Sequence, residues 1–165
     1  MSLYFLEVYM DNNSKFYFVV AGSKEYINYV EFSCIMDSLL KDYPSDKLVI
    51  ISGGAIGTDK MAEKYCGERN IESVVINAEW DKHKIPGTNF NPAGFIRNRK
   101  MHEYIVEHAD YEHRGCICFW DNDGRGTSNN FALCEEFDTR LVIYNWIVHK
   151  YMNSSTVKGY KYKMR

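Results

Sequence analysis

Strand-like and helix-like patterns of apolar residues alternate along this chain. Short apolar runs, rich in β-branched and aromatic residues, predict buried strands at 15–23, 47–52, 72–78, 114–120 and 140–146. Apolar residues at three-to-four spacing predict helices at 26–43, 58–70, 93–110 and 126–138. Such alternation implies parallel crossovers, so we expect an α/β fold: a Rossmann-like, doubly wound, mainly parallel sheet flanked by helices.

The helical spacing also predicts which side chains face the core. In the helix at 26–43 these are Val30, Cys34, Ile35, Leu39 and Leu40. In the helix at 58–70 they are Met61, Ala62, Tyr65 and Cys66, and this helix is expected to stop near Gly67 or Asn70. The polar segment 79–92 has the length of a lid or binding loop.

The chain has 165 residues, 45% of them hydrophobic, which is enough for one domain with a proper core. We expect that domain at 15–146. Residues 1–14 form an N-terminal extension, either an edge strand or a dimer contact, and residues 147–165 form a basic C-terminal tail.

Charge is distributed unevenly. From Thr139 onward there are six of the 20 Lys and Arg and none of the 22 Asp and Glu, so the rest of the chain carries a net charge of −8. An acidic body argues against nucleic acid as a partner across a broad face, because the phosphate backbone requires a positive one. The tail either touches an acidic partner or is a solvated end.

Targeting and redox signals predict a cytoplasmic protein. There is no apolar run of about 18 residues to span a membrane, and the start has no basic region typical of a signal peptide. The five cysteines include no CxxC pair, so we expect reduced, buried thiols and no metal site.

Small residues follow three predicted strands where the chain enters a helix. They are Gly22-Ser23, then Gly53, Gly54, Gly57, Thr58 and Asp59, then Gly124, Arg125, Gly126 and Thr127. Ligands bind at the carboxyl ends of parallel strands. Glycine lets a phosphate approach the backbone, and a helix N-terminus favours an anion. These turns therefore predict phosphate binding, although Asp59 could instead cap its own helix.

The turns resemble known proteins when read in order. AGS (21–23), SGGAIGTDKMAEKYC (52–66), AEWDKH (78–83), AGFIRNRKM (93–101) and DGRGTSN (123–129) look like the YspA-like branch of the SLOG superfamily. That superfamily also includes the LOG (lysine-decarboxylase-like) phosphoribohydrolases and the DNA-processing protein A family. The resemblance implies a Rossmann-like domain that holds a nucleotide-derived, ADP-ribose-like ligand, in a bacterial or phage homo-oligomer.

One departure from the LOG pattern PGGxGTxxE bears on catalysis. Gly124, Gly126 and Thr127 match, but the proline falls on Asn122 and the glutamate on Asn130. An amide cannot take a proton as a carboxylate does or stabilise an oxocarbenium ion by charge. LOG-type hydrolysis is therefore in doubt, whereas phosphate binding is not.

Other polar residues near the strand ends are further candidates. Arg97 is a good phosphate clamp beside Asn98, and Trp80 could stack on a base or simply pack. Three carboxylates could act as catalysts in place of the missing glutamate: Asp81, Asp121 and Asp123. No cofactor is required, although Mg²⁺ could accompany a phosphate near these carboxylates.

The sequence thus favours a sensor or sequestering protein for a nucleotide-derived ligand. Two alternatives stay open. One is a hydrolase of nucleotide or ADP-ribose derivatives, N-glycosidase-like in its chemistry. The other is a protein that handles single-stranded nucleic acid and uses the basic tail.

Overall fold

The computed structural model describes residues 14–153, and these form one six-stranded sheet in the order β3-β2-β1-β4-β5-β6. The strands are β1 (Phe16–Gly22), β2 (Leu48–Ser52), β3 (Glu72–Val75), β4 (Arg114–Trp120), β5 (Arg140–Asn145) and β6 (Lys150–Met152). β1 to β5 pair in parallel, and β6 runs antiparallel to β5. The predicted mainly parallel α/β sheet is confirmed.

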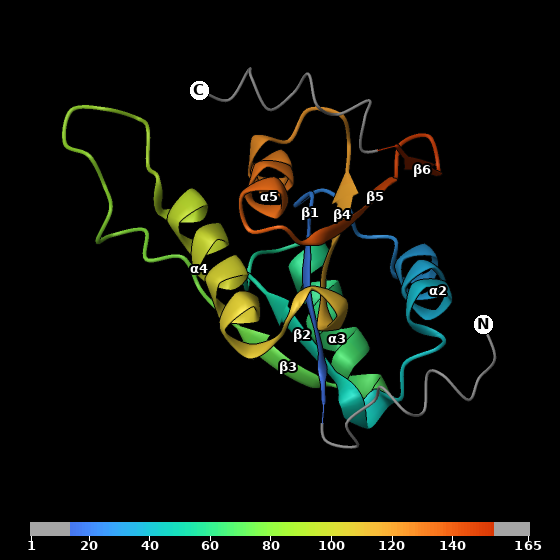
Figure 1. The fold of residues 1–165 in the computed structure, drawn as a ribbon. Helices are drawn as coiled ribbons and strands as arrows, with labels where there is room; N and C mark the ends of the chain where they lie inside the picture. The colour runs from blue at the N-terminus through green and yellow to red at the C-terminus, as the bar shows by residue number, and fades with distance from the viewer. Residues whose placement is uncertain (1–13, 154–165) are drawn as a thin grey trace.

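Helices cover both faces of the sheet (Figure 1). They are α2 (Tyr29–Leu40), α3 (Thr58–Arg69), α4 (Ala93–His108) and α5 (Arg125–Glu136), with 3₁₀ turns at Ser45–Lys47 and Tyr111–His113. Side chains of α2 and α3 join one apolar cluster with alternate strand residues, and those of α4 and α5 join a second cluster on the opposite face. Two buried faces make the fold doubly wound, as predicted.

The face of α2 that packs on the sheet matches the prediction in part: Leu40 is buried, and Ile35 and Leu39 are partly buried against the apolar cluster. Phe32, Met36 and Leu40 are buried, whereas Val30 is 74% exposed and Cys34 is also exposed. The face of α3 is as predicted: Met61, Ala62, Tyr65 and Cys66 are all buried, and Asn70 ends the helix in a left-handed conformation.

The sheet extends beyond the boundary expected at residue 146. Lys150–Met152 pairs with β5 through the register Ile143↔Met152, so the beginning of the basic segment belongs to the domain. The expected N-terminal edge strand or dimer contact, and the basic residues after Asn153, lie outside the described residues.

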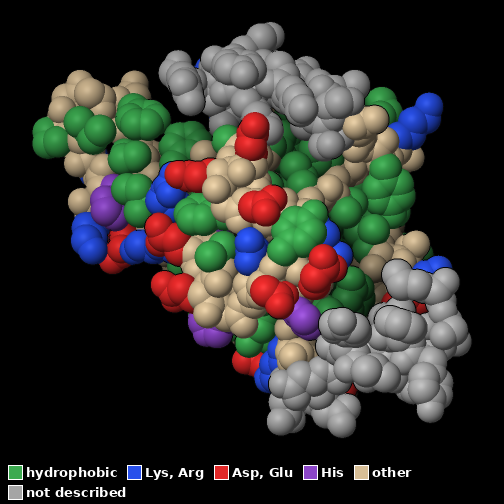
Figure 2. Space-filling model, in the orientation of Figure 1, with side chains coloured by type: hydrophobic (Ala, Val, Ile, Leu, Met, Phe, Trp, Pro, Cys, Tyr) green, Lys and Arg blue, Asp and Glu red, His purple; other side chains and the backbone are tan. Residues whose placement is uncertain are grey.

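Charged side chains of both signs alternate on the face that carries α4 (Figure 2). Arg99 pairs with Glu136 at 2.7 Å and Lys100 pairs with Glu79 at 3.0 Å. Within residues 14–153, no helix is both long and apolar enough to cross a membrane.

The strand order places a topological switch point between β1 and β4. From β1 the chain crosses to β2 on one side, and from β4 to β5 on the other. At their carboxyl ends β1 and β4 are tied by the Ser23 N–H, which donates to Phe119 O at 3.0 Å. Loops diverge from such a point and leave a crevice.

Candidate functional site at the carboxyl ends of the strands

A cavity of about 190 Å³ opens at the switch point. A second hollow of about 530 Å³ adjoins it and shares Lys24, Ala55, Arg97, Asn98 and Gly126 with it. The predicted residues that line one or both are Gly22, Ser23, Gly54, Asp59, Trp80, Arg97, Asn98, Asp121, Gly124, Gly126 and Thr127. The structure thus brings together most of the residues singled out from the sequence, although they span more than 100 positions.

The β2–α3 turn supports the cavity more than it faces it. Thr58 is fully buried, and both its N–H, at 3.2 Å, and its hydroxyl, at 3.0 Å, donate to Ser23 O. Gly57 has φ 75°, and a side chain there would strike the backbone of Lys24. These two residues therefore join the turn to β1, and they are absent from the cavity lining.

Asp59 enters the cavity from the first turn of α3. Its Oδ2 accepts a hydrogen bond of 3.1 Å from the Ala55 N–H, so the carboxylate closes the glycine turn. Burial is the main cause that raises the pKa of Asp59 to about 6. The N–H of Ala55 and the charge of Arg97 act against this rise.

Arg97 is the cation of the cavity and comes from the second turn of α4. Its Nη1 donates to Gly53 O, and its Nε donates to Asn98 Oδ1 at 2.9 Å. Burial lowers the pKa of the guanidinium, while Asp59 raises it. Asn98 in turn donates to Gly126 O at 3.0 Å, which fixes α4 against α5.

The β4–α5 turn is organised by Asp121. Its Oδ1 accepts from the N–H groups of Gly124, at 2.8 Å, and Asp123, at 3.0 Å, and its Oδ2 accepts from Ser23 Oγ at 3.1 Å. Burial raises the pKa of Asp121, but these hydrogen bonds outweigh it, so the pKa is lowered. Asn122, where LOG enzymes have proline, has φ 76°, a conformation that proline cannot adopt.

The first turn of α5 supplies free donors. Within the part of the chain that the structure describes, no acceptor pairs with the N–H groups of Arg125, Gly126 or Thr127. Gly126 and Thr127 line the cavity, and Arg125 is exposed beside it. A helix N-terminus with unpaired N–H groups favours an anion.

Trp80 lies at the larger hollow and is 50% exposed. The ammonium of Lys24 lies 6.0 Å from the centre of its indole ring, and Asn91 Nδ2 donates to its carbonyl oxygen at 2.8 Å. Asp81 and Asp123 are exposed and line neither hollow, so Asp121 alone of the three catalytic candidates faces the cavity.

Three polar residues that line the smaller cavity were not among the predicted ligand-binding residues: Lys24, Glu25 and Asn130. Lys24 and Glu25 follow the β1 turn, where the strand's end could have indicated them. Glu25 Oε2 lies 2.9 Å from Ser23 Oγ and competes with Asp121 Oδ2 for its single proton. Asn130 lines the cavity although it stands where LOG enzymes carry glutamate. It is buried, with Oδ1 on His102 Nε2 at 3.0 Å and Nδ2 donating to Gly126 O and Thr127 O at 3.3 Å.

Comparison with known proteins identifies a similar family and a similar fold. Residues 18–83 match the model of the family described as YAcAr: YspA, cpYpsA-related SLOG family. Residues 18–83 are thus similar to the YspA-related SLOG family. The resemblance predicted from the sequence is thereby confirmed over residues 18–83, which include Ser23, the β2–α3 turn and Trp80. Arg97 and the β4–α5 turn lie after it.

The fold is also similar to a solved structure, that of DNA processing protein A from Helicobacter pylori, described for its single-stranded DNA binding mode. The TM-score is 0.56 at 15% sequence identity, over 93% of this chain and 75% of that one. At this identity the likeness concerns the fold. No curated protein sequence matches this chain.

Proposed function

We propose that the protein binds a nucleotide-derived ligand in the cavity at the switch point. The observation that carries this proposal is the convergence of unpaired N–H groups at the start of α5 with the Arg97 guanidinium on one cavity. Backbone donors and arginine together suit a phosphate group.

The shape of the site supports a ligand larger than phosphate. The hollow beside Trp80, about 530 Å³, is in the range of about 300–1,000 Å³ that small-molecule sites occupy. It adjoins the smaller cavity, where the phosphate group would lie, and shares Arg97 and Gly126 with it. A base or ribose against the half-exposed indole, with its phosphate at α5, would fill both parts, as in an ADP-ribose-like molecule.

Binding without cleavage is the form of this function that the site supports best. The Asn130 amide uses both of its ends in internal hydrogen bonds and carries no charge. Asp121, the one of the three candidate catalytic carboxylates that lines the cavity, already accepts three hydrogen bonds that hold the turn. A sensor or sequestering protein needs neither group to transfer a proton.

The test is thermal unfolding with AMP, ADP, ATP, ADP-ribose, NAD and cyclic dinucleotides, followed by analysis of the recovered ligand. A ligand at 100 times its Kd adds about 2.7 kcal/mol of stability. We expect a raised Tm with intact ligand, measured both with Mg²⁺ and with EDTA because Glu25 and Asp121 face the same cavity. Recovery of cleaved ligand would support the hydrolase instead.

Two glycines provide a matched pair of variants. Gly126 and Gly67 both lie in helices, and a Cβ added at either position would have no heavy atom within 4 Å. Gly126 lines the cavity, whereas Gly67 does not. Gly126→Val should abolish the ligand-induced shift, whereas Gly67→Val should keep it. Equal shifts in both variants, or no shift in the native protein, would contradict the proposal.

The aromatic residues of the loop after β3 favour single-stranded nucleic acid as a second candidate. Trp80 and Phe90 are 50% and 55% exposed, and Lys82 and Lys84 lie between them. Exposed aromatics interleaved with lysines suit stacking on single strands, and the similar fold of the Helicobacter pylori protein is described with single-stranded DNA.

This candidate makes a separate prediction. A single-stranded 20-mer should bind with affinity that falls as salt rises, and Trp80→Ala and Phe90→Ala should each weaken it. Truncation after Asn153 tests the basic tail without removing β6. Salt-independent or undetectable oligonucleotide binding would exclude this function.

A further inference from the structure

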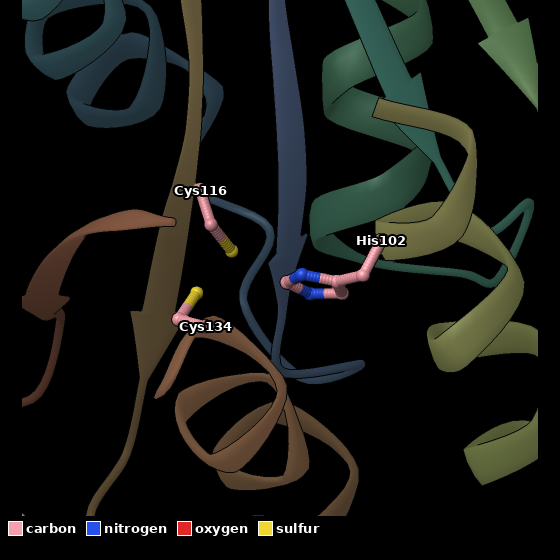
Figure 3. A group of neighbouring side chains, drawn as sticks. All are labelled: His102, Cys116 and Cys134. Carbon is pink, nitrogen blue, oxygen red and sulfur yellow. The ribbon is translucent and has the colours of Figure 1, made fainter. Parts of the chain in front are cut away.

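A buried group of metal-binding side chains lies behind the cavity, between α4, β4 and α5. His102, Cys116 and Cys134 each offer one donor atom, and these atoms lie within 4.8 Å of one another. Figure 3 shows the nitrogen-bearing edge of the imidazole turned toward the two thiols. The three side chains come from separate elements, so the fold alone brings them together.

The protonation of His102 follows from its neighbour Asn130. The Nδ2 of Asn130 donates to two carbonyl oxygens, so its Oδ1 is the atom that meets His102 Nε2 at 3.0 Å. An oxygen acceptor requires a proton on Nε2, which leaves the lone pair on Nδ1. This is the arrangement of metal-binding histidines, whose second nitrogen donates to a fixed acceptor.

The other nitrogen has no partner within the described residues. His102 Nδ1 is buried without a hydrogen bond, and the residue is 0% exposed. A buried polar atom without a partner carries a free-energy cost, because it has lost its hydrogen bonds to water. An ion between Nδ1 and the two sulfurs would remove that cost.

We propose that His102, Cys116 and Cys134 form a binding site for a soft monovalent cation of the Cu(I) class. Thiolate sulfur and imidazole nitrogen suit Cu(I) and Zn²⁺, but structural zinc takes four ligands. The group supplies three, and its members are at most 4% exposed, so no bulk water completes a tetrahedron. Cys118, with Sγ 3.6 Å from Cys116 Sγ, lies outside the group.

The spacing allows an ion with small side-chain movements. Three ligands at bond lengths of about 2.3 Å around a trigonal ion are separated by about 4 Å, compared with the 4.8 Å limit observed. Binding displaces the two thiol protons to solvent and transfers no electron. This inference is independent of the proposed nucleotide function.

The experiment loads the whole protein with Cu(I). Since the site is buried, the protein is refolded anaerobically with Cu(I), and bicinchoninate then removes loosely held metal. We expect one retained Cu(I) per chain, and X-ray absorption should show two sulfur atoms and one imidazole nitrogen around it. No retained copper, sulfur-only coordination, or retention of Zn²⁺ in preference to Cu(I) would overturn the site.

Three cysteine variants separate this site from other thiols. Cys134→Ala should weaken Cu(I) retention at least tenfold. Cys66→Ala, a buried thiol in the opposite apolar cluster, and Cys34→Ser, an exposed thiol, should retain copper like the native protein. Equal retention in Cys134→Ala would contradict the proposal. The X-ray absorption spectrum of the native protein tests the proposed site even if Cys134→Ala does not fold.

Discussion

The guanidinium of Arg97 occupies the place that a side chain at residue 53 would take. Arg97 Nη1 donates to the carbonyl oxygen of Gly53, and a Cβ added to Gly53 would strike the guanidinium. The glycine at the end of β2 is therefore needed to seat the cation of the cavity, and not to admit a phosphate directly.

Gly53→Ala should consequently disturb Arg97. We expect a loss of about 1–3 kcal/mol in the free energy of unfolding, the usual cost of overpacking, measured by urea denaturation. If Arg97 contributes to ligand binding, the ligand-induced rise in Tm should shrink in the same variant.

Gly67→Ala is the control for this substitution. Gly67 is exposed in α3 with open space around it, so alanine should stabilise the helix by up to about 1 kcal/mol. A Gly53→Ala protein as stable as the native one would show that Arg97 moves aside without cost.

Asp59 should make the protein less stable as pH rises from about 4 to about 6. Its pKa is raised from 3.8 to about 6 in the fold, chiefly by burial. Between these values the native state binds more protons than the unfolded state, so stability is lost with rising pH and is lowest above about 6. A pKa shift of this size corresponds to a change of roughly 3 kcal/mol in the free energy of unfolding.

Asp59→Asn isolates this contribution. Its stability relative to the native protein should increase between pH 4 and pH 7, measured by urea denaturation at each pH. A difference between the two proteins that is constant across this range would mean that Asp59 titrates normally in the fold.

His102 should make the protein more stable as pH rises from about 4 to about 6.5. Burial is the main cause that lowers its pKa from 6.5 to about 4, so between these values the unfolded state binds more protons and stability rises with pH. His102→Gln should remove roughly 3 kcal/mol of this dependence. In the metal-free protein, a His102 resonance, identified by its loss in His102→Gln, that titrates near 6.5 by NMR would contradict this expectation.

Strands β1 to β5, the helices and the glycine turns could be predicted because each depends on residues close in sequence, whereas β6 was not predicted. KLVIIS and RGCICFW became β2 and β4, and the turns after them border one cavity because parallel strands end on one edge of the sheet. The role of Thr58 could not be predicted, since its partner Ser23 O is 35 residues away and only the folded turn brings them together.

Two other features could not be predicted from the sequence, for physical reasons. In α2, two apolar stripes have helical spacing, and the larger side chains of Phe32 and Met36 are buried in place of Val30 and Cys34. The group of His102, Cys116 and Cys134 has no ligand spacing in the sequence, because α4, β4 and α5 meet only in three dimensions.

Asn130→Asp should destabilise the protein strongly despite its matching shape. The change removes the Nδ2 donor from Gly126 O and Thr127 O and places a carboxylate at a position that is 1% exposed. An unpaired buried acceptor costs about 1–3 kcal/mol and a charged group more, so we expect a loss of roughly 3 kcal/mol at pH 8 by urea denaturation. The loss should be smaller at pH 5, where a buried carboxyl is more readily protonated and the donor is restored. Ser38→Ala, at an exposed position in α2, is a control that should change stability little at either pH. Equal losses at both pH values would show that the added charge is not the cause.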